Sequence, residues 1–142
     1  MQQLRNYMTF MSWDKTYSVN IRSIDDQHRK IVHMINELHN SVIKGLPREL
    51  LDRILVTLSI TIIKHFIYEE SLFKKHNYKH LNEHKKEHDD LAERIIEFNK
   101  KHTIQNETLD ENLLTFFKNM MYEHITITDQ QYIDFMSLHG VQ

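Results

Sequence analysis

Four stretches of the 142-residue sequence carry apolar residues at intervals of three and four positions, which is the spacing of one face of an α-helix. The segments between them are short, and the whole chain contains only two glycines and one proline. Because β-rich folds need many turns, this pattern favours long helices with short connections. We therefore expect an all-α fold, an up-down-up-down antiparallel four-helix bundle, with main helices over residues 24–44, 47–76, 80–101 and 108–128.

The first 22 residues show no helical period, so we expect an extended N-terminal arm over residues 1–22 of a single domain that spans 1–142. A chain of this length buries about two-thirds of its unfolded surface, which is enough for a core without cross-links. We expect three residues of the arm to pack against the bundle: Trp13, Tyr17 and Val19.

Polar residues and one glycine predict where some of the helices begin and end. Ser23 or Asp25 can cap the first helix, because a short oxygen-bearing side chain accepts a hydrogen bond from the first helical turn. Gly45 marks the end of that helix. Thr108, with Glu111 three residues later, has the spacing of a capping box for the fourth helix.

Charge and hydropathy exclude several classes of function. The net charge of −2 comes from well-mixed residues of both signs and gives no basic surface for nucleic acid. No apolar run approaches the roughly 20 residues that span a bilayer. The first residues also lack the long apolar core of a signal peptide. We expect a cytoplasmic, monomeric protein with neither a membrane nor a nucleic-acid partner.

Residues of the kinds that bind metals interrupt all four apolar stripes. They occur early in the first and third predicted helices and late in the second and fourth. In an antiparallel bundle, these four helix ends lie at the same level. We therefore expect seven side chains to converge at one end of the interior: His28, His65, Glu69, His84, His88, His124 and Asp129.

The chemistry of this set predicts a metal centre. A buried charge without a partner costs several kcal/mol, and a metal ion removes that cost. Five imidazoles and two carboxylates exceed the four ligands of a tetrahedral zinc ion and suit two ions that share bridging carboxylates. The imidazoles argue against magnesium or calcium, and the lack of cysteine argues against a thiolate site. Iron fits best, and a metal-free bundle is the alternative.

The spacing of His124 and Asp129 raises a geometric difficulty. Five residues correspond to about 140° around an ideal helix, so the two side chains would diverge. The segment HITITD is rich in β-branched residues, which weaken a helix locally. We therefore expect a π-bulge or an irregular turn at 124–129. An unbroken α-helix there would contradict a ligand role for Asp129.

The remaining histidines fall outside the stripes, in connections or near the C-terminus. Isolated histidines of this kind are usually surface residues, and we expect this of His33, His39, His76, His80, His102 and His139. Three apolar residues beside the predicted ligands are expected to face the metals: Ile31, Phe66 and Met121.

Together these motifs resemble the hemerythrin family, in particular its single-domain bacterial members, over most of the chain. The resemblance rests on the spacing of all seven predicted ligands and on short motifs around them. These are W-x-x-x-Y-S-V at Trp13–Val19, I-D-x-Q-H at Ile24–His28, HFIYEE at His65–Glu70, H-x-x-x-H at His84–His88, and H-x-x-x-x-D at His124–Asp129 with the following Tyr132.

The resemblance implies a non-haem di-iron centre. His84, His88 and His124 would bind one iron, and His28 and His65 would bind the other. The two irons would be bridged by Glu69, Asp129 and a solvent-derived oxygen. The first iron then has six ligands and the second has five. The open position takes dioxygen in this family, and the pocket around it would be lined by Ile31, Phe66 and Met121.

The implied function is reversible binding of dioxygen, for storage, transport or delivery to oxygen-requiring enzymes, rather than catalysis. Two alternatives stay open: an oxygen or redox sensor that acts through a partner, and a weak di-iron oxidase or peroxidase. Ferritin-like di-iron enzymes carry Glu-x-x-His, which this sequence lacks. The chain also departs from the family, because Met120 and Met121 replace a common Trp-Leu pair. We expect Met121 to loosen the pocket and to speed autoxidation.

Overall fold

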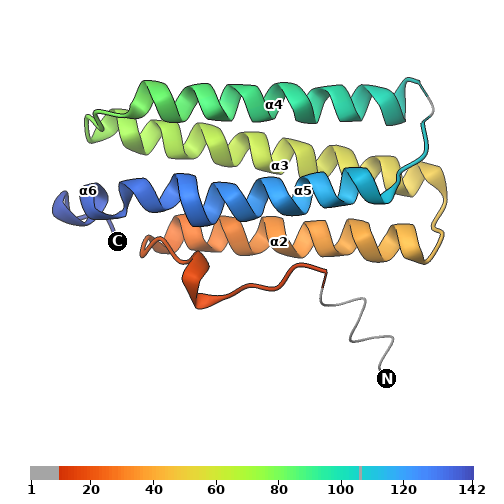
Figure 1. Cartoon of the computed structure of the whole chain (residues 1–142), viewed down its shortest axis with the longest axis horizontal. Coiled ribbons are helices and arrows are strands. Elements are labelled where there is room, and N and C mark those ends of the chain that lie inside the picture. The colour runs from red at the N-terminus through yellow and green to blue at the C-terminus, as the bar shows by residue number, and fades with distance from the viewer. Residues whose placement is uncertain (1–9, 106) are drawn as a thin grey trace.

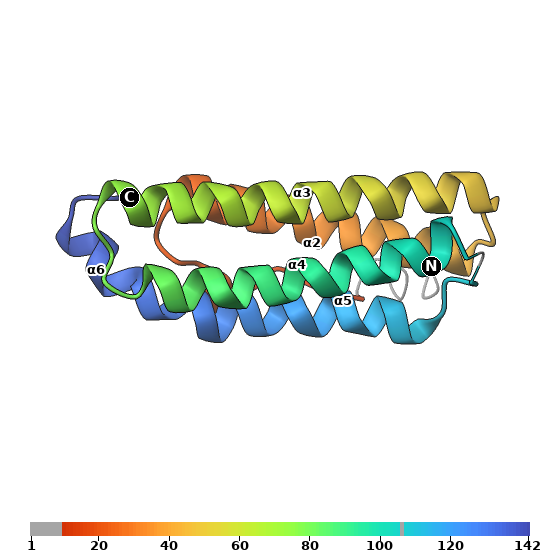
Figure 2. The ribbon, with the colours of Figure 1, turned by 90° about the horizontal axis from the view of Figure 1, so that it is seen from above.

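The computed structural model describes residues 10–105 and 107–142, and these residues form an antiparallel four-helix bundle (Figure 1). The four long helices lie side by side, and Figure 2 shows the same bundle from above. No β-strand occurs in the described ranges, and none of their helices is both long and apolar enough to cross a bilayer. The long helices are α2 (Arg22–Ile43), α3 (Arg48–Lys75), α4 (Leu81–Thr103) and α5 (Glu111–Glu123). The predicted fold class is therefore confirmed.

Shorter elements flank the bundle at both ends of the chain. A 3-10 turn, η1 (Lys15–Tyr17), interrupts the arm. After α5 the chain continues through a π-helical segment, η2 (His124–Thr128), a 3-10 turn, η3 (Asp129–Tyr132), and a last short helix, α6 (Ile133–Leu138). The sequence-based prediction included residues 124–128 in the fourth α-helix. In the structure, α5 ends at Glu123 and these residues form the π-helical segment instead.

The start of α2 differs from the prediction. The helix begins at Arg22, and neither Ser23 nor Asp25 caps it, so that expectation was wrong. Instead, the Asp25 carboxylate accepts hydrogen bonds from the Val19 backbone N–H at 2.9 Å and the Ser18 hydroxyl at 2.6 Å. Asp25 is buried because it joins the arm to the helix.

The start of α5 also differs. The helix begins at Glu111, and its N-cap is Asp110, whose carboxylate accepts a hydrogen bond from the Leu113 N–H at 3.1 Å. The predicted capping box at Thr108 is therefore wrong, and the start at residue 108 is three positions too early. Asp110 has an extended backbone and caps the helix, while the preceding Leu109 is buried.

The arm packs along the bundle as predicted, over the part that the structure describes. Phe10 stacks on His39 with ring centroids 4.0 Å apart. The side-chain amide of Asn36 accepts a hydrogen bond from the Met11 N–H and donates one to the Met11 carbonyl. Residues 1–9 lie outside the described residues. Val19 is buried, while Trp13 and Tyr17 are half-buried.

The off-stripe histidines are only partly as expected. His33, His80 and His139 are exposed, and two others, His39 and His76, are half-buried. His102 is 4% exposed, so its predicted surface position was wrong. Its Nδ1 donates to the Glu107 carbonyl at 2.7 Å, because the chain turns back over it between α4 and α5.

Two separate apolar clusters fill the interior. The main cluster occupies most of the bundle, and the end cluster lies at the end where α6 packs. Buried members of the main cluster include Ile31, Leu58, Phe66, Ile95, Phe117 and Met121. The end cluster consists of Val19, Ile21, Ile24, Phe73, Tyr78, Tyr132 and Met136.

The predicted ligands lie between these clusters along the helices. On α3, Glu69 falls one turn from Phe66 of the main cluster and one turn from Phe73 of the end cluster. His28 occupies the same intermediate position on α2. The structure therefore contains a buried polar layer with apolar packing on both sides.

Candidate metal centre

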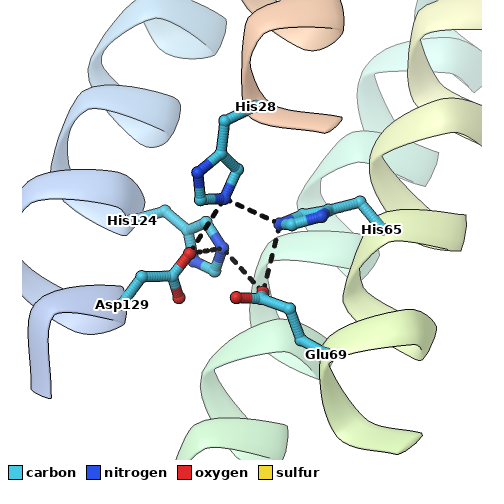
Figure 3. Close-up of side chains that lie close together, drawn as sticks. All are labelled: His28, His65, Glu69, His124 and Asp129. Atoms are coloured by element: carbon cyan, nitrogen blue, oxygen red, sulfur yellow. Dashed lines mark hydrogen bonds and ion pairs between the residues drawn. The ribbon is translucent and has the colours of Figure 1, made fainter. Parts of the chain in front are cut away.

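All seven predicted ligands converge in this layer. Each is at most 4% exposed, and they come from four different segments of the chain. Their ligand atoms form two overlapping groups in which all atoms lie within 4.8 Å of one another. Figure 3 shows one group, His28, His65, Glu69, His124 and Asp129. The other group is Glu69, His84, His88, His124 and Asp129.

The two carboxylates connect the groups. Glu69 Oε1 lies 3.1 Å from the Nε2 atoms of His65 and His124, and 3.2 Å from that of His88. A single carboxylate on α3 therefore reaches imidazoles of both groups.

Asp129 makes the same connection from the other side of the layer. Its Oδ2 lies 3.0 Å from the Nε2 atoms of both His28 and His124. Its Oδ1 lies 3.1 Å from His84 Nε2. Asp129 therefore also contacts imidazoles of both groups, which is the position that a bridging ligand needs.

Several inward-facing atoms lack hydrogen bonds although they are buried. Among the described residues, no hydrogen-bond partner satisfies the Nε2 atoms of His84 and His88 or either Asp129 oxygen. The Nε2 atoms of His28 and His65 lie 3.0 Å apart and face each other. Unsatisfied buried polar atoms cost about 1–3 kcal/mol each, and a bound cation would remove that cost. Imidazole and carboxylate donors fit a first-row transition metal cation.

The electrostatics of the layer also favour a cation. Burial alone would raise the pKa of the Glu69 carboxyl, but the His65 and His124 rings outweigh it and hold the pKa well below its usual value. Burial and Glu69 raise the pKa of Asp129, yet His124 and His28 bring it down to about 2. The side chains of Glu69 and Asp129 are therefore ionised carboxylates, which is the form that binds metals.

The imidazoles respond in two different ways. Burial dominates at His65 and lowers its pKa, so this ring is neutral and can bind a metal. At His124 burial also lowers the pKa, but the Asp129 and Glu69 carboxylates outweigh it and raise the pKa well above its usual value. Positive charge is thus stabilised where the two groups overlap.

The π-helical segment explains how Asp129 reaches the layer. The backbone N–H of Asp129 donates to the carbonyl of His124, five residues earlier, and this wider turn places both side chains on the same face. The Gln130 amide donates to the carbonyls of Ile125 at 3.2 Å and Ser18 at 3.3 Å, which also ties the arm to this segment. The predicted irregularity at 124–129 is confirmed.

The sequence pattern of the Hemerythrin HHE cation binding domain matches residues 19–136, a range that contains the whole layer. The chain belongs to the hemerythrin family. It is 29% identical over 136 residues to a bacteriohemerythrin of Stenotrophomonas maltophilia, covering 93% of this chain and 85% of that protein. It is 30% identical over 127 residues to a bacteriohemerythrin of Clostridium acetobutylicum, covering 86% and 98%.

Solved hemerythrin structures support the same assignment. A crystal structure of wild-type hemerythrin superposes with a TM-score of 0.83 at 28% sequence identity, and the match covers 88% of this chain and 96% of that one. Fold, cluster and sequence pattern therefore agree on the family.

Three residues that sequence reasoning did not assign contact the predicted ligands from outside. The Tyr132 hydroxyl donates to Glu69 Oε2 at 2.7 Å. Gln27 Oε1 lies 2.7 Å from His65 Nδ1, and Glu70 Oε2 lies 2.9 Å from His88 Nδ1. Gln27 and Glu70 are sequence neighbours of predicted ligands, but each reaches a ligand on another helix. All three residues occur in the motifs quoted for the family resemblance. The sequence did not reveal which ligand each one contacts, because that depends on how the helices pack.

The three predicted pocket residues are buried beside the layer. The Phe66 ring stacks on His88 with centroids 4.2 Å apart and an interplanar angle of 9°, and it lies 5.1 Å from His124. Ile31 and Met121 are completely buried one turn from His28 and His124, respectively. That these three residues line a dioxygen pocket stays a prediction.

Proposed function

We propose that this chain binds dioxygen reversibly at a non-haem di-iron centre, for storage, transport or delivery to oxygen-requiring enzymes. The observation that carries the proposal is the pair of overlapping donor groups that share two buried carboxylates. His84, His88 and His124 would hold one iron, His28 and His65 the other, and Glu69 and Asp129 would bridge them. Such an iron pair, when bound, supplies two electrons and one open coordination position.

The protein's own contribution is to orient the ligands and to exclude water. Tyr132 holds Glu69 through the oxygen that does not face His65 and His124. Burial, together with the Asp129 and Glu69 charges, raises the pKa of this phenol well above its usual value, so it stays a hydrogen-bond donor. All seven side chains are at most 4% exposed, and apolar clusters lie on both sides of the layer, so little bulk water reaches it.

These features support binding rather than turnover. The cage is rich in imidazole, and the relatives named above carry the name bacteriohemerythrin. A phenol that retains its proton is a poor acid for driving a reduced oxygen species out of the site. We further propose that the protein acts as a cytoplasmic monomer.

An anaerobic loading experiment tests the function. The protein is purified without air and loaded with ferrous iron, the iron per chain is counted, and oxygen is then admitted and removed while the visible spectrum is recorded. We expect two irons per chain and a spectral change that reverses when oxygen is removed. The variant His88→Ala should hold less iron, whereas His33→Ala, which alters an exposed histidine, should behave as the parent.

The opposite results are equally clear. Irreversible oxidation with a released product would replace the proposal with a di-iron oxidase or peroxidase. A reversible signal that appears only together with a co-purified protein would favour a sensor.

A further inference from the structure

The outer Nδ1 atoms of the five clustered histidines have very different surroundings. His88 Nδ1 donates to the Glu70 carboxylate at 2.9 Å, whereas His65 Nδ1 donates to the neutral amide oxygen of Gln27 at 2.7 Å. The Nδ1 atoms of His28 and His124 are buried, with no hydrogen-bond partner in the described part of the chain. His84 forms part of the wall of a surface hollow of about 390 Å³. Among the described residues, His88 is the one of these five histidines whose Nδ1 donates a hydrogen bond to a carboxylate.

We propose that Glu70 is a positioning residue that polarises the His88 imidazole and makes the two metal positions electronically unequal. The inference rests on the proposed di-iron function. A carboxylate that accepts the Nδ1 proton increases the electron density at Nε2, which strengthens the bond to a cation and favours its oxidised form. The Gln27 amide carries no charge, so it orients His65 without this effect.

The surroundings of His88 fix the ring for this role. Phe66 stacks flat against one face of the imidazole, while Glu70 holds the edge opposite to Nε2. Nε2 then lies 3.2 Å from the shared Glu69 oxygen. Two contacts therefore determine the plane and the rotation of the ring before any cation binds.

The consequence is an order of oxidation within the pair. The position held by His84, His88 and His124 carries the polarised ring, so this position should favour the oxidised ion more than the position held by His28 and His65. After the loss of one electron from the pair, the reduced ion would be at the position held by His28 and His65, which in the proposed function has the open coordination site. A tenfold preference for the oxidised ion corresponds to about 59 mV in a one-electron potential.

Two reciprocal variants separate charge from shape. Glu70→Gln keeps an acceptor for His88 but removes the charge, and Gln27→Glu adds a charge behind His65. The Glu70 side chain is 20% exposed, so its replacement does not leave a sealed cavity. Glu93→Gln, which changes an exposed carboxylate of α4, controls for net charge.

The first measurement uses cobalt(II) under nitrogen, because it reports metal binding without oxygen chemistry. We expect the metal-free parent to bind two cobalt ions, and Glu70→Gln to weaken one of the two steps by about 10- to 100-fold. Gln27→Glu should strengthen the other step. The second measurement is a redox titration of the iron-loaded proteins, in which Glu70→Gln should raise one of the two potentials by about 59 mV or more.

The inference fails if Glu70→Gln matches Glu93→Gln in both cobalt steps and in both potentials. If circular dichroism shows that Glu70→Gln does not fold, Gln27→Glu decides, and unchanged cobalt binding in that variant overturns the inference. The proposed function fails separately: the cobalt steps can shift as expected while the iron-loaded parent shows no reversible oxygen signal.

Discussion

Removal of the hydrogen bond from Tyr132 to Glu69 tests how strongly the surrounding protein stabilises the carboxylate that both donor groups share. Tyr132→Phe removes the hydroxyl that donates to Glu69 Oε2 at 2.7 Å and keeps the rest of a fully buried ring. A hydrogen bond to a charged group contributes about 1.5–3 kcal/mol. In a domain of this size each kcal/mol shifts the melting temperature by about 3 °C, so metal-free Tyr132→Phe should melt roughly 5–9 °C below the parent.

Thermal unfolding followed by circular dichroism is the assay, with Tyr78→Phe as the matched control. Tyr78 belongs to the same end cluster, and no hydrogen bond of its hydroxyl is found among the described residues. The two variants therefore lose the same atom, but one of them also loses a contact with a buried charge. Equal losses in the two variants would refute the reasoning. Bound metal gives the Glu69 carboxylate another partner, so the difference should shrink in the loaded protein.

The same phenol makes stability depend on alkaline pH. Burial first, and then the Asp129 and Glu69 carboxylates, raise the pKa of Tyr132 well above its usual value of about 10. The folded state thus holds this proton more tightly than the unfolded state. Its contribution is complete below pH 10 and is lost as the pH rises above that value. Urea unfolding should show a steeper loss above pH 10 for the parent than for Tyr132→Phe, and parallel curves would contradict this.

Three other substitutions probe the pocket, the bridge and the arm. Met121→Leu nearly conserves volume and removes a flexible thioether, so the oxygenated form should decay more slowly in the visible spectrum; equal decay rates would dismiss the idea. Asp129→Asn removes a charge that both donor groups share, so elemental analysis should find fewer than two irons per chain, and full loading would exclude a bridging role. Asp25→Ala deletes the acceptor for the Val19 N–H and the Ser18 hydroxyl, each bond contributing about 1.5 kcal/mol or more. The arm should then be cut faster by protease at unchanged iron content; unaltered cleavage would show that other contacts hold it.

Periodicity was enough to predict the bundle and the convergence of the seven polar side chains. His28, His65 and His84 fall at positions where an aliphatic residue would continue a buried stripe, so their direction follows from helix geometry. Their common level follows from the antiparallel arrangement. The π-segment was predictable for a related reason, since His124 and Asp129 cannot share a face on a regular helix.

Contacts between helices and choices between similar caps were not predictable in this way. Glu70 lies about 100° away from Glu69 on α3, and only the approach of α4 gives it His88 as a partner. Thr108 and Asp110 both carry a capping oxygen. In the structure Asp110 caps the helix, and Leu109, between the two candidates, is buried. A single sequence does not reveal that burial. His102 is buried because of a loop closure that has no periodic signal.

The polar layer divides the hydrophobic interior into two separate clusters, and this division affects how the chain unfolds. Regions with independent apolar packing open as independent units unless something couples them. Here the coupling passes through the buried imidazoles and carboxylates of the layer, so a bound metal pair would join the two clusters. We therefore expect metal loading to decide whether the end that contains α6 unfolds alone or together with the rest.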